Sequence, residues 1–193
     1  MKKILLGFLK FGYKILFLPV VKKGNSFITS KIPKTELSKI HVNNAKLLTT
    51  REELLSLLPI GGVVAELGVD QGDFSESILN ITKPKKLHLI DSWGSKRYNQ
   101  KKRTSVENRF SEGVKKNSIE INIGLSTEVV TNFKDNYFDW IYIDGSHEYE
   151  DVKADLAYWI PKVKKGGYIC GHDFSLDDNW KWEGVHGAVC EFI

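Results

Sequence analysis

The stretch that decides the fold is Val63-Val64-Ala65-Glu66-Leu67-Gly68-Val69-Asp70-Gln71-Gly72. Its apolar run ends in an acid and is followed by two glycines four positions apart. This pattern predicts a buried strand that turns through a loop into a helix over residues 73–81, which Asp73 or Ser75 can cap. Glycine lets such a loop adopt positive φ angles and lets a ligand approach its backbone closely. A glycine pair alone does not establish a ligand-binding loop, so this interpretation depends on the elements predicted further along the chain.

Four further strand patterns follow, and each leads into aspartate or glycine. Residues 87–90, 138–143 and 167–170 are apolar runs, and residues 119–123 alternate apolar with polar side chains. Helical patterns separate the later runs, over residues 106–116, 127–133 and 152–163. Alternating strands and helices predict an α/β fold with right-handed crossovers and a doubly wound, mostly parallel sheet.

Acidic residues stand at the ends of several of these strands. Ligands of open α/β sheets bind beyond the carboxyl ends of the strands, so these acids are candidate ligand-binding residues. A single aspartate at a strand end can equally cap a turn or a helix. The occurrence of four such acids favours a shared site, and they are Glu66, Asp91, Asp144 and Asp173.

The segment from Glu66 to Gly72 resembles the first motif of class I S-adenosylmethionine-dependent methyltransferases. Asp91 falls where the ribose-binding acid of that family follows the second strand. Two further segments, 143–149 and 166–173, resemble the fourth and fifth strand ends of the small-molecule and sugar O-methyltransferases of that class, in which an Asp-Gly-x-His segment precedes a helix. The resemblance runs from about residue 49 to residue 193.

This resemblance implies a Rossmann-like fold and a set of donor-binding residues. S-adenosylmethionine would be held by Glu66, Gly68, Gly72 and Asp91. Trp93 and Ser126 are additional candidates for the adenine pocket, although an aromatic residue at position 93 can equally belong to the core.

The chain departs from the family pattern in three places. Asp70 replaces a loop glycine, and the third strand ends in Gly124-Leu125-Ser126 without the acid that often contacts the adenine amino group. Such domains usually continue into an antiparallel pair of strands, whereas this sequence ends at Ile193, in a helix expected from about residue 185. We therefore expect the fold to lack the C-terminal antiparallel strands, as a minimal or a truncated version.

The expected chemistry follows from the donor. A sulfonium methyl group is already activated, so the enzyme must mainly align an acceptor and exclude water. A hydroxyl acceptor reacts once it loses its proton or binds a cation. His147 is the candidate general base, with the alternative that it caps the next helix. Asp144 and Asp173 should end neighbouring strands about 5 Å apart, which suits Mg²⁺. The resemblance also implies a metal, but His172 stands where relatives often have a second acid, and imidazole is a less usual Mg²⁺ ligand.

Length and composition indicate one domain. The 193 residues are 41% hydrophobic and 27% charged, as in ordinary globular proteins. The two cysteines, Cys170 and Cys190, are expected to pack as small apolar groups and not to form a disulfide.

The positive charge is concentrated at the N-terminus. Residues 1–35 hold eight lysines and no acid, so the rest of the chain has 20 basic and 24 acidic residues, a net charge of −4. An acidic body argues against a nucleic acid partner. The basic run at residues 96–103 is expected to be a solvated loop, with contact to a phosphorylated substrate as the alternative.

Residues 4–18 show helical spacing, with an apolar face opposite Lys10 and Lys14. The two lysines exclude a transmembrane span. Two alternatives stay open: a basic amphipathic helix on an anionic membrane surface, or a helix packed on its own domain or a second subunit. We expect an N-terminal arm and linker at 1–48, in which residues 24–39 form a linker or a cover close to the substrate. A cofactor-binding methyltransferase domain at 49–193 should begin with a capped helix.

These observations predict a cytoplasmic S-adenosylmethionine-dependent O-methyltransferase. Its acceptor would be a hydroxyl of a small molecule or glycan, and the arm offers a peripheral contact with the inner membrane face. A homo-oligomer and a non-catalytic cofactor-binding or membrane-docking module stay open. A nicotinamide-dependent dehydrogenase is disfavoured, because the glycine spacing from Gly68 to Gly72 is not Gly-x-Gly-x-x-Gly.

Overall fold

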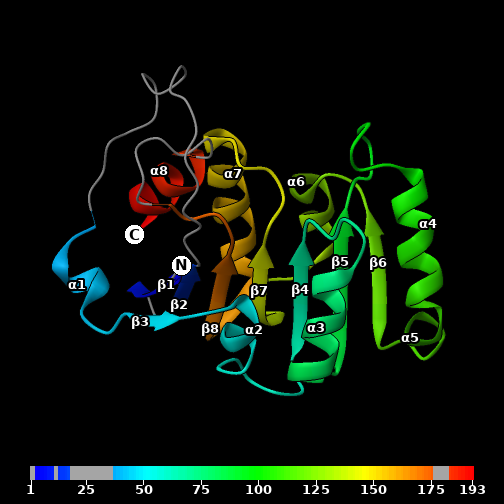
Figure 1. Ribbon diagram of the computed structural model, residues 1–193, viewed down its shortest axis with the longest axis horizontal. Helices are drawn as coiled ribbons and strands as arrows, with labels where there is room; N and C mark the ends of the chain where they lie inside the picture. Colours follow the sequence, from blue (N-terminus) through cyan, green and yellow to red (C-terminus); the bar gives the residue numbers. More distant parts are fainter. Residues whose placement is uncertain (1–2, 11–12, 18–36, 176–182) are drawn as a thin grey trace.

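The computed structural model describes residues 3–10, 13–17, 37–175 and 183–193 of the chain (Figure 1). The described strands form one sheet of eight, in the order β3-β1-β2-β8-β7-β4-β5-β6. Their bounds are β1 (Lys3–Lys10), β2 (Tyr13–Phe17), β3 (Lys46–Leu48), β4 (Val63–Leu67), β5 (Lys86–Asp91), β6 (Ile119–Ile123), β7 (Phe138–Ile143) and β8 (Val163–Gly171).

Five strands form the parallel centre of this sheet, from β8 through β7, β4 and β5 to β6. The strand β4 lies between β7 and β5, and four of its five residues are buried. All five central strands point the same way, so their carboxyl ends meet at one edge (Figure 1). The expected doubly wound, mostly parallel sheet is confirmed.

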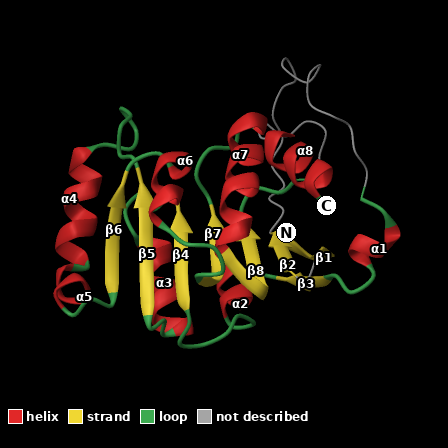
Figure 2. Cartoon of the chain, turned by 180° about the vertical axis from the view of Figure 1, so that it is seen from behind, coloured by secondary structure: helices red, strands yellow, loops and turns green. Residues whose placement is uncertain are grey.

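Helices cover both faces of the sheet. On one face α2, α3 and α4 enclose a core that includes Leu54, Ile78 and Val106. On the other face α6, α7 and α8 pack over a second core around Trp159 (Figure 2). The bounds are α1 (Lys39–Val42), α2 (Arg51–Leu55), α3 (Asp73–Thr82), α4 (Gln100–Arg109), α5 (Ser111–Lys115), α6 (Ser126–Val129), α7 (Tyr149–Trp159) and α8 (Glu183–Phe192), with 3₁₀ turns η1 (Val130–Asn132) and η2 (Ile160–Lys162).

Several helix limits differ from the sequence-based expectation. The helix expected at 106–116 is two helices, and the first begins at residue 100 because the Asn99 side chain accepts hydrogen bonds from the backbone N–H groups of Lys101 and Lys102. The helix expected at 152–163 ends at Trp159, because Pro161 stands in the 3₁₀ turn before β8. The capped helix α2 was predicted correctly: the Thr50 side chain accepts a hydrogen bond from the N–H of Glu53.

The expected helix over residues 4–18 is wrong. Within this range the described residues form β1 and β2, an antiparallel pair, and β2 lies parallel to β8. Both strands are rich in aliphatic and aromatic residues, and Gly7 disfavours a helix. A nearly continuous apolar run is typical of a strand buried inside a sheet. The expected linker at 24–39 lies mostly outside the described residues.

The last described element is α8, which ends at Phe192. The edge of β8 is paired with β2, so the N-terminal strands extend the sheet on this side. Among the described residues, no helix combines the length and the apolar character that crossing a membrane would require.

Candidate active site

The ends of β7 and β8 bring three titratable residues together. Ile143 pairs with Gly171 in the parallel register, and the N–H of His172 donates a hydrogen bond to the Ile143 carbonyl at 3.2 Å. Asp144 therefore leaves β7 directly beside His172 and Asp173, which follow β8. Asp173 has a φ of 54°, a left-handed conformation that is uncommon outside glycine and is found at functional sites more often than elsewhere.

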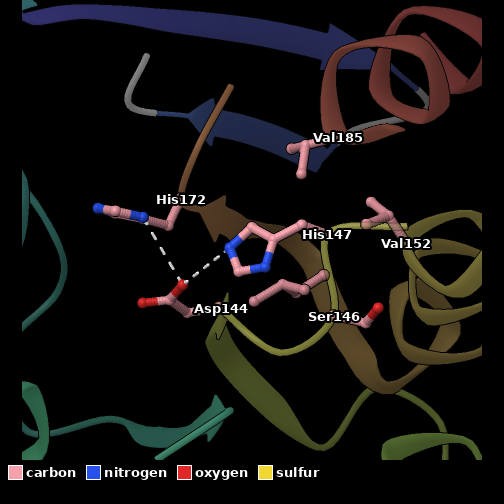
Figure 3. Close-up of a pocket in the computed structure, with 7 residues that line it drawn as sticks. Asp144, Ser146, His147, Val152, His172 and Val185 are labelled. Carbon is pink, nitrogen blue, oxygen red and sulfur yellow. Dashed lines mark ion pairs between the residues drawn. The ribbon is translucent and has the colours of Figure 1, made fainter. Parts of the chain in front are cut away.

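His147 completes this group from the loop between β7 and α7 (Figure 3). Its Nε2 lies 2.6 Å from Oδ2 of Asp173 and 3.8 Å from Oδ1 of Asp144. The Nδ1 of His172 lies 3.2 Å from Oδ1 of Asp173 and 3.7 Å from Asp144. Asp173 thus contacts both imidazoles, and its carboxylate fixes the ring of His147.

The two carboxylates have opposite pKa shifts. Burial raises the pKa of Asp144 to about 6, although the charges of His172 and His147 oppose this effect. Burial also acts to raise the pKa of Asp173, but hydrogen bonds from His147 and His172 outweigh it and hold that pKa well below its usual range. For His172, burial acts to lower the pKa, and the contacts with Asp173 and Asp144 raise it overall. The pair formed by Asp173 and His147 therefore contains a firmly ionised carboxylate.

A small pocket opens at this cluster. Its lining residues come from β7, the loop that follows it, α7, the segment after β8, and α8, and they are Ile143, Asp144, Ser146, His147, Val152, His172 and Val185. Gly184, at the start of α8, lies so close to the backbone of His147 and Tyr149 that a Cβ would collide with both. The start of α8 is therefore fitted to the loop that carries His147.

The four polar groups of the cluster form a candidate metal site. One ligand atom from each of Asp144, His147, His172 and Asp173 lies within 4.8 Å of the others. Mg²⁺ prefers six oxygen ligands at about 2.1 Å, whereas two of these four groups are imidazoles, which suit Zn²⁺ or Mn²⁺ better. The donor set does not fit the expected Mg²⁺.

The glycine loop approaches the same site from β4. The N–H of Asp144 donates to the Leu67 carbonyl at 2.8 Å, and the N–H of Gly68 donates to the Ile90 carbonyl at 2.9 Å. Gly68 has a φ of 89°, and a Cβ there would lie well inside van der Waals distance of the Asp144 carbonyl oxygen. Gly68 is therefore required for close backbone packing next to the cluster, a reason that the sequence did not reveal.

Asp91 holds the other side of the loop. One of its carboxylate oxygens accepts hydrogen bonds from the N–H groups of Val69 and Asp70, at 2.9 and 3.0 Å, and the other accepts from the N–H of Trp93. The side chain of Asp70 pairs with Lys102 from α4. These contacts order the loop, and the expected contact of Asp91 with a ribose stays a prediction.

Glu66 lies beneath the loop and is 1% exposed. The Ser75 hydroxyl donates a hydrogen bond to its carboxyl group. Burial raises the pKa of Glu66 to about 8, against the opposing effect of the Ser75 hydrogen bond, and the charges of Asp144 and Asp91 add to the rise. Gly72, which precedes α3, leaves room for the Phe110 ring, since a Cβ would lie 2.6 Å from it.

The raised pKa of Glu66 predicts a pH-dependent stability. A folded-state pKa above the normal 4.5 stabilises the protein below pH 4.5, and this contribution is lost as the pH rises through about 8. We expect Glu66→Gln to become more stable relative to the unsubstituted protein between pH 5 and pH 8, by up to about 5 kcal/mol. Urea unfolding at each pH measures the difference. Glu112→Gln, at an exposed glutamate, is the control. The prediction would be contradicted if the stabilities of Glu66→Gln and of the unsubstituted protein changed in parallel with pH.

The two candidates for the adenine pocket, Trp93 and Ser126, form hydrogen bonds with other residues of the protein. Trp93 is 5% exposed, and its indole N–H donates to the Asp70 carbonyl at 2.9 Å, so it packs in the core beside the loop. The Ser126 hydroxyl bonds to the buried carboxylate of Asp155 on α7. Burial raises the pKa of Asp155 to about 6, against the hydrogen bond from Ser126. Neither residue lines the pocket at His147.

Sequence reasoning missed Arg51, the first residue of α2. Its guanidinium lies 4.2 Å from the centre of the Phe74 ring, and one of its terminal nitrogens lies 3.8 Å from Oδ2 of Asp144. The sequence predicts the helix correctly but gives no sign that its first residue reaches the ends of β4 and β7.

Comparison with known proteins identifies the family. The model of a methyltransferase domain family matches residues 65–174, which is more than half of the chain and runs from within β4 to just beyond β8. The chain belongs to this methyltransferase family.

Individual relatives of this methyltransferase domain are distant. The uncharacterized protein y4gI of Sinorhizobium fredii is 40% identical over 53 residues, which are 28% of this chain and 6% of that protein. A protein from Corynebacterium glutamicum shares the fold, with a TM-score of 0.55 and 16% identity over 82% of this chain and 70% of that one. A geranyl diphosphate methyltransferase in complex with S-adenosylmethionine gives a TM-score of 0.49 and 11% identity, over 77% of this chain and 60% of that one.

Proposed function

We propose that this methyltransferase domain transfers a methyl group from S-adenosylmethionine to a hydroxyl of a small molecule or glycan. The observation that carries the proposal is the 2.6 Å contact between His147 and Asp173, beside the backbone of Gly68. A base held by a carboxylate next to a glycine loop is what deprotonation of a hydroxyl close to a bound donor needs.

His147 takes the acceptor proton in this mechanism. In the neutral ring, the Nε2–H of His147 donates a hydrogen bond to Asp173, and Nδ1 is then the nitrogen that accepts a proton. The ionised Asp173 then stabilises the imidazolium that forms, as a carboxylate does for a histidine base. Asp144 supplies further negative charge near the sulfonium above its raised pKa of about 6, and the apolar Ile143, Val152 and Val185 limit the entry of water.

A divalent ion held by Asp144, His172 and Asp173 would polarise the acceptor hydroxyl and lower its pKa. The imidazole of His172 favours a transition-metal ion over Mg²⁺ in that role. The proton transfer described above uses only side chains of this chain and requires no ion.

The sequence leaves two other functions to weigh. A nicotinamide-dependent dehydrogenase is disfavoured because the spacing from Gly68 to Gly72 is not Gly-x-Gly-x-x-Gly. A non-catalytic cofactor-binding module would leave the contact between His147 and Asp173 without a purpose.

The class of acceptor is tested by release of S-adenosylhomocysteine on a panel of sugars, phenols, amines and carboxylic acids. We expect release with hydroxyl acceptors, because a histidine base suits a hydroxyl proton. Turnover confined to amines would contradict O-methylation while leaving methyl transfer itself intact.

A further inference from the structure

Arg51 is a partly exposed cation beside Asp144, and the proton transfer proposed above gives it no role. Among the described residues, its nearest carboxylates are Glu52 at 3.7 Å and Asp144 at 3.8 Å, both beyond hydrogen-bond distance. A guanidinium has five N–H donors in a planar fork that matches a carboxylate. At these separations neither carboxylate accepts a hydrogen bond from the guanidinium, so its N–H donors remain available for a ligand carboxylate.

The guanidinium is nevertheless held in a fixed place. It lies 4.2 Å from the centre of the Phe74 ring, and that ring packs against Tyr142 at 4.4 Å in the core. Phe74 is 4% exposed, whereas the Arg51 side chain is 30% exposed. A cation stacked on a buried ring but open to solvent on its other side is ordered in advance for a ligand.

The surrounding charges favour one kind of ligand. The carboxylates of Asp91 and Asp144 lie beside the loop between β4 and α3, and the charge of Arg51 opposes the rise in the pKa of Asp144. Two carboxylates together with the guanidinium of Arg51 suit a molecule that carries two positive groups and one carboxylate. S-adenosylmethionine has this pattern, with its sulfonium, its ammonium and its carboxylate.

The position of Arg51 relative to the glycine loop agrees with this interpretation of the charges. Phe74 is the second residue of α3, immediately after the glycine loop, and Asp144 contacts that loop through the Gly68 backbone. Arg51 therefore lies at the end of the donor loop that also meets the catalytic cluster. The methyl-bearing end of the donor must reach this cluster for transfer to occur.

We propose that Arg51, stacked on Phe74, is a carboxylate-binding subsite that holds the carboxylate of the methionine part of S-adenosylmethionine. This assignment rests on the proposed function and adds a residue from outside the matched family region. It also gives α2 a role in placing the donor sulfonium near His147.

The test compares two ligands that differ only in the carboxylate. Affinities of S-adenosylmethionine and decarboxylated S-adenosylmethionine are measured by calorimetry for the full chain, for Arg51→Gln and for Arg51→Lys. We expect Arg51→Gln to weaken binding of S-adenosylmethionine by about 10- to 100-fold, as for a charge-assisted bidentate pair, and binding of the decarboxylated ligand by less than about threefold. Arg51→Lys should fall between, because it keeps the charge and loses the fork.

Arg103→Gln is the matched control, because Arg103 is equally exposed and pairs with Glu107 on α4. An equal loss for both ligands in Arg51→Gln would overturn the proposal and show that Arg51 acts through Asp144 or through folding. Unchanged affinities would overturn it as well. If the full chain binds neither ligand, the proposed function itself fails, which is a different result from a failure of Arg51 alone.

Discussion

We expect His147→Ala to lower the rate of methyl transfer by about 10²- to 10⁴-fold, because general-base assistance acts in the transition state. Affinity for S-adenosylmethionine should stay nearly unchanged, because we propose that the donor is held by the loop between β4 and α3. The rate is measured as S-adenosylhomocysteine release with an active acceptor from the panel, and affinity by calorimetry. Asp173→Asn should reproduce part of the loss, because it removes the charge that fixes the His147 ring.

The control is His41→Ala, a histidine of α1 that does not line the pocket. It should retain the rate of the unsubstituted protein. If His147→Ala keeps more than about a tenth of the rate, His147 is not the base, and its contact with Asp173 is structural. A large loss of donor affinity in this variant would instead indicate that His147 binds the donor.

The second large effect is expected at Gly68. A Cβ there would overlap the Asp144 carbonyl oxygen, and the φ of 89° strains any other residue. We expect Gly68→Ala to lower the free energy of unfolding by about 3 to 5 kcal/mol, as the sum of backbone strain and overpacking. Donor affinity and turnover should fall with it, because the shifted backbone carries Asp144. Urea unfolding and calorimetry measure the two effects.

Gly61 offers a matched control for this prediction. Its φ is 78°, but a Cβ at this position would meet nothing within 4 Å. Gly61→Ala should therefore show the strain alone, about 1 to 2 kcal/mol, and keep donor affinity. Equal destabilisation in both variants would mean that close packing against Asp144 is unimportant. A Gly68→Ala protein that does not fold, beside a folded Gly61→Ala protein, supports the prediction.

Most of the central fold was predictable from local patterns. The strands β6 and β7 begin and end at the residues that their sequence patterns indicate. The central β7 is a short, nearly continuous apolar segment, and the edge strand β6 alternates apolar with polar residues. The prediction of a helix in the N-terminal segment was wrong because its local pattern is ambiguous. Residues 4–18 are apolar at nearly every position, and the choice between helix and strand depends on the distant edge of β8, which no local pattern reports.

The site was predictable in its members but not in its contacts. Spacing along the sequence placed Asp144 and Asp173 at neighbouring strand ends, but the contact of Asp173 with both imidazoles depends on its positive φ. Glu66 looked like a ligand contact and is a buried carboxyl with a raised pKa. Arg51 was missed because its contact with Phe74 joins α2 to α3 on one face of the sheet, and a contact between two helices leaves no periodic signal in the sequence.

The central claim is that this chain binds S-adenosylmethionine, and calorimetric titration of the purified chain tests it most directly. Titrations with S-adenosylmethionine and with NAD⁺ are run separately on the same preparation. We expect saturable binding of one S-adenosylmethionine per chain, competition by S-adenosylhomocysteine, and no binding of NAD⁺. Binding of NAD⁺ without binding of S-adenosylmethionine would contradict it.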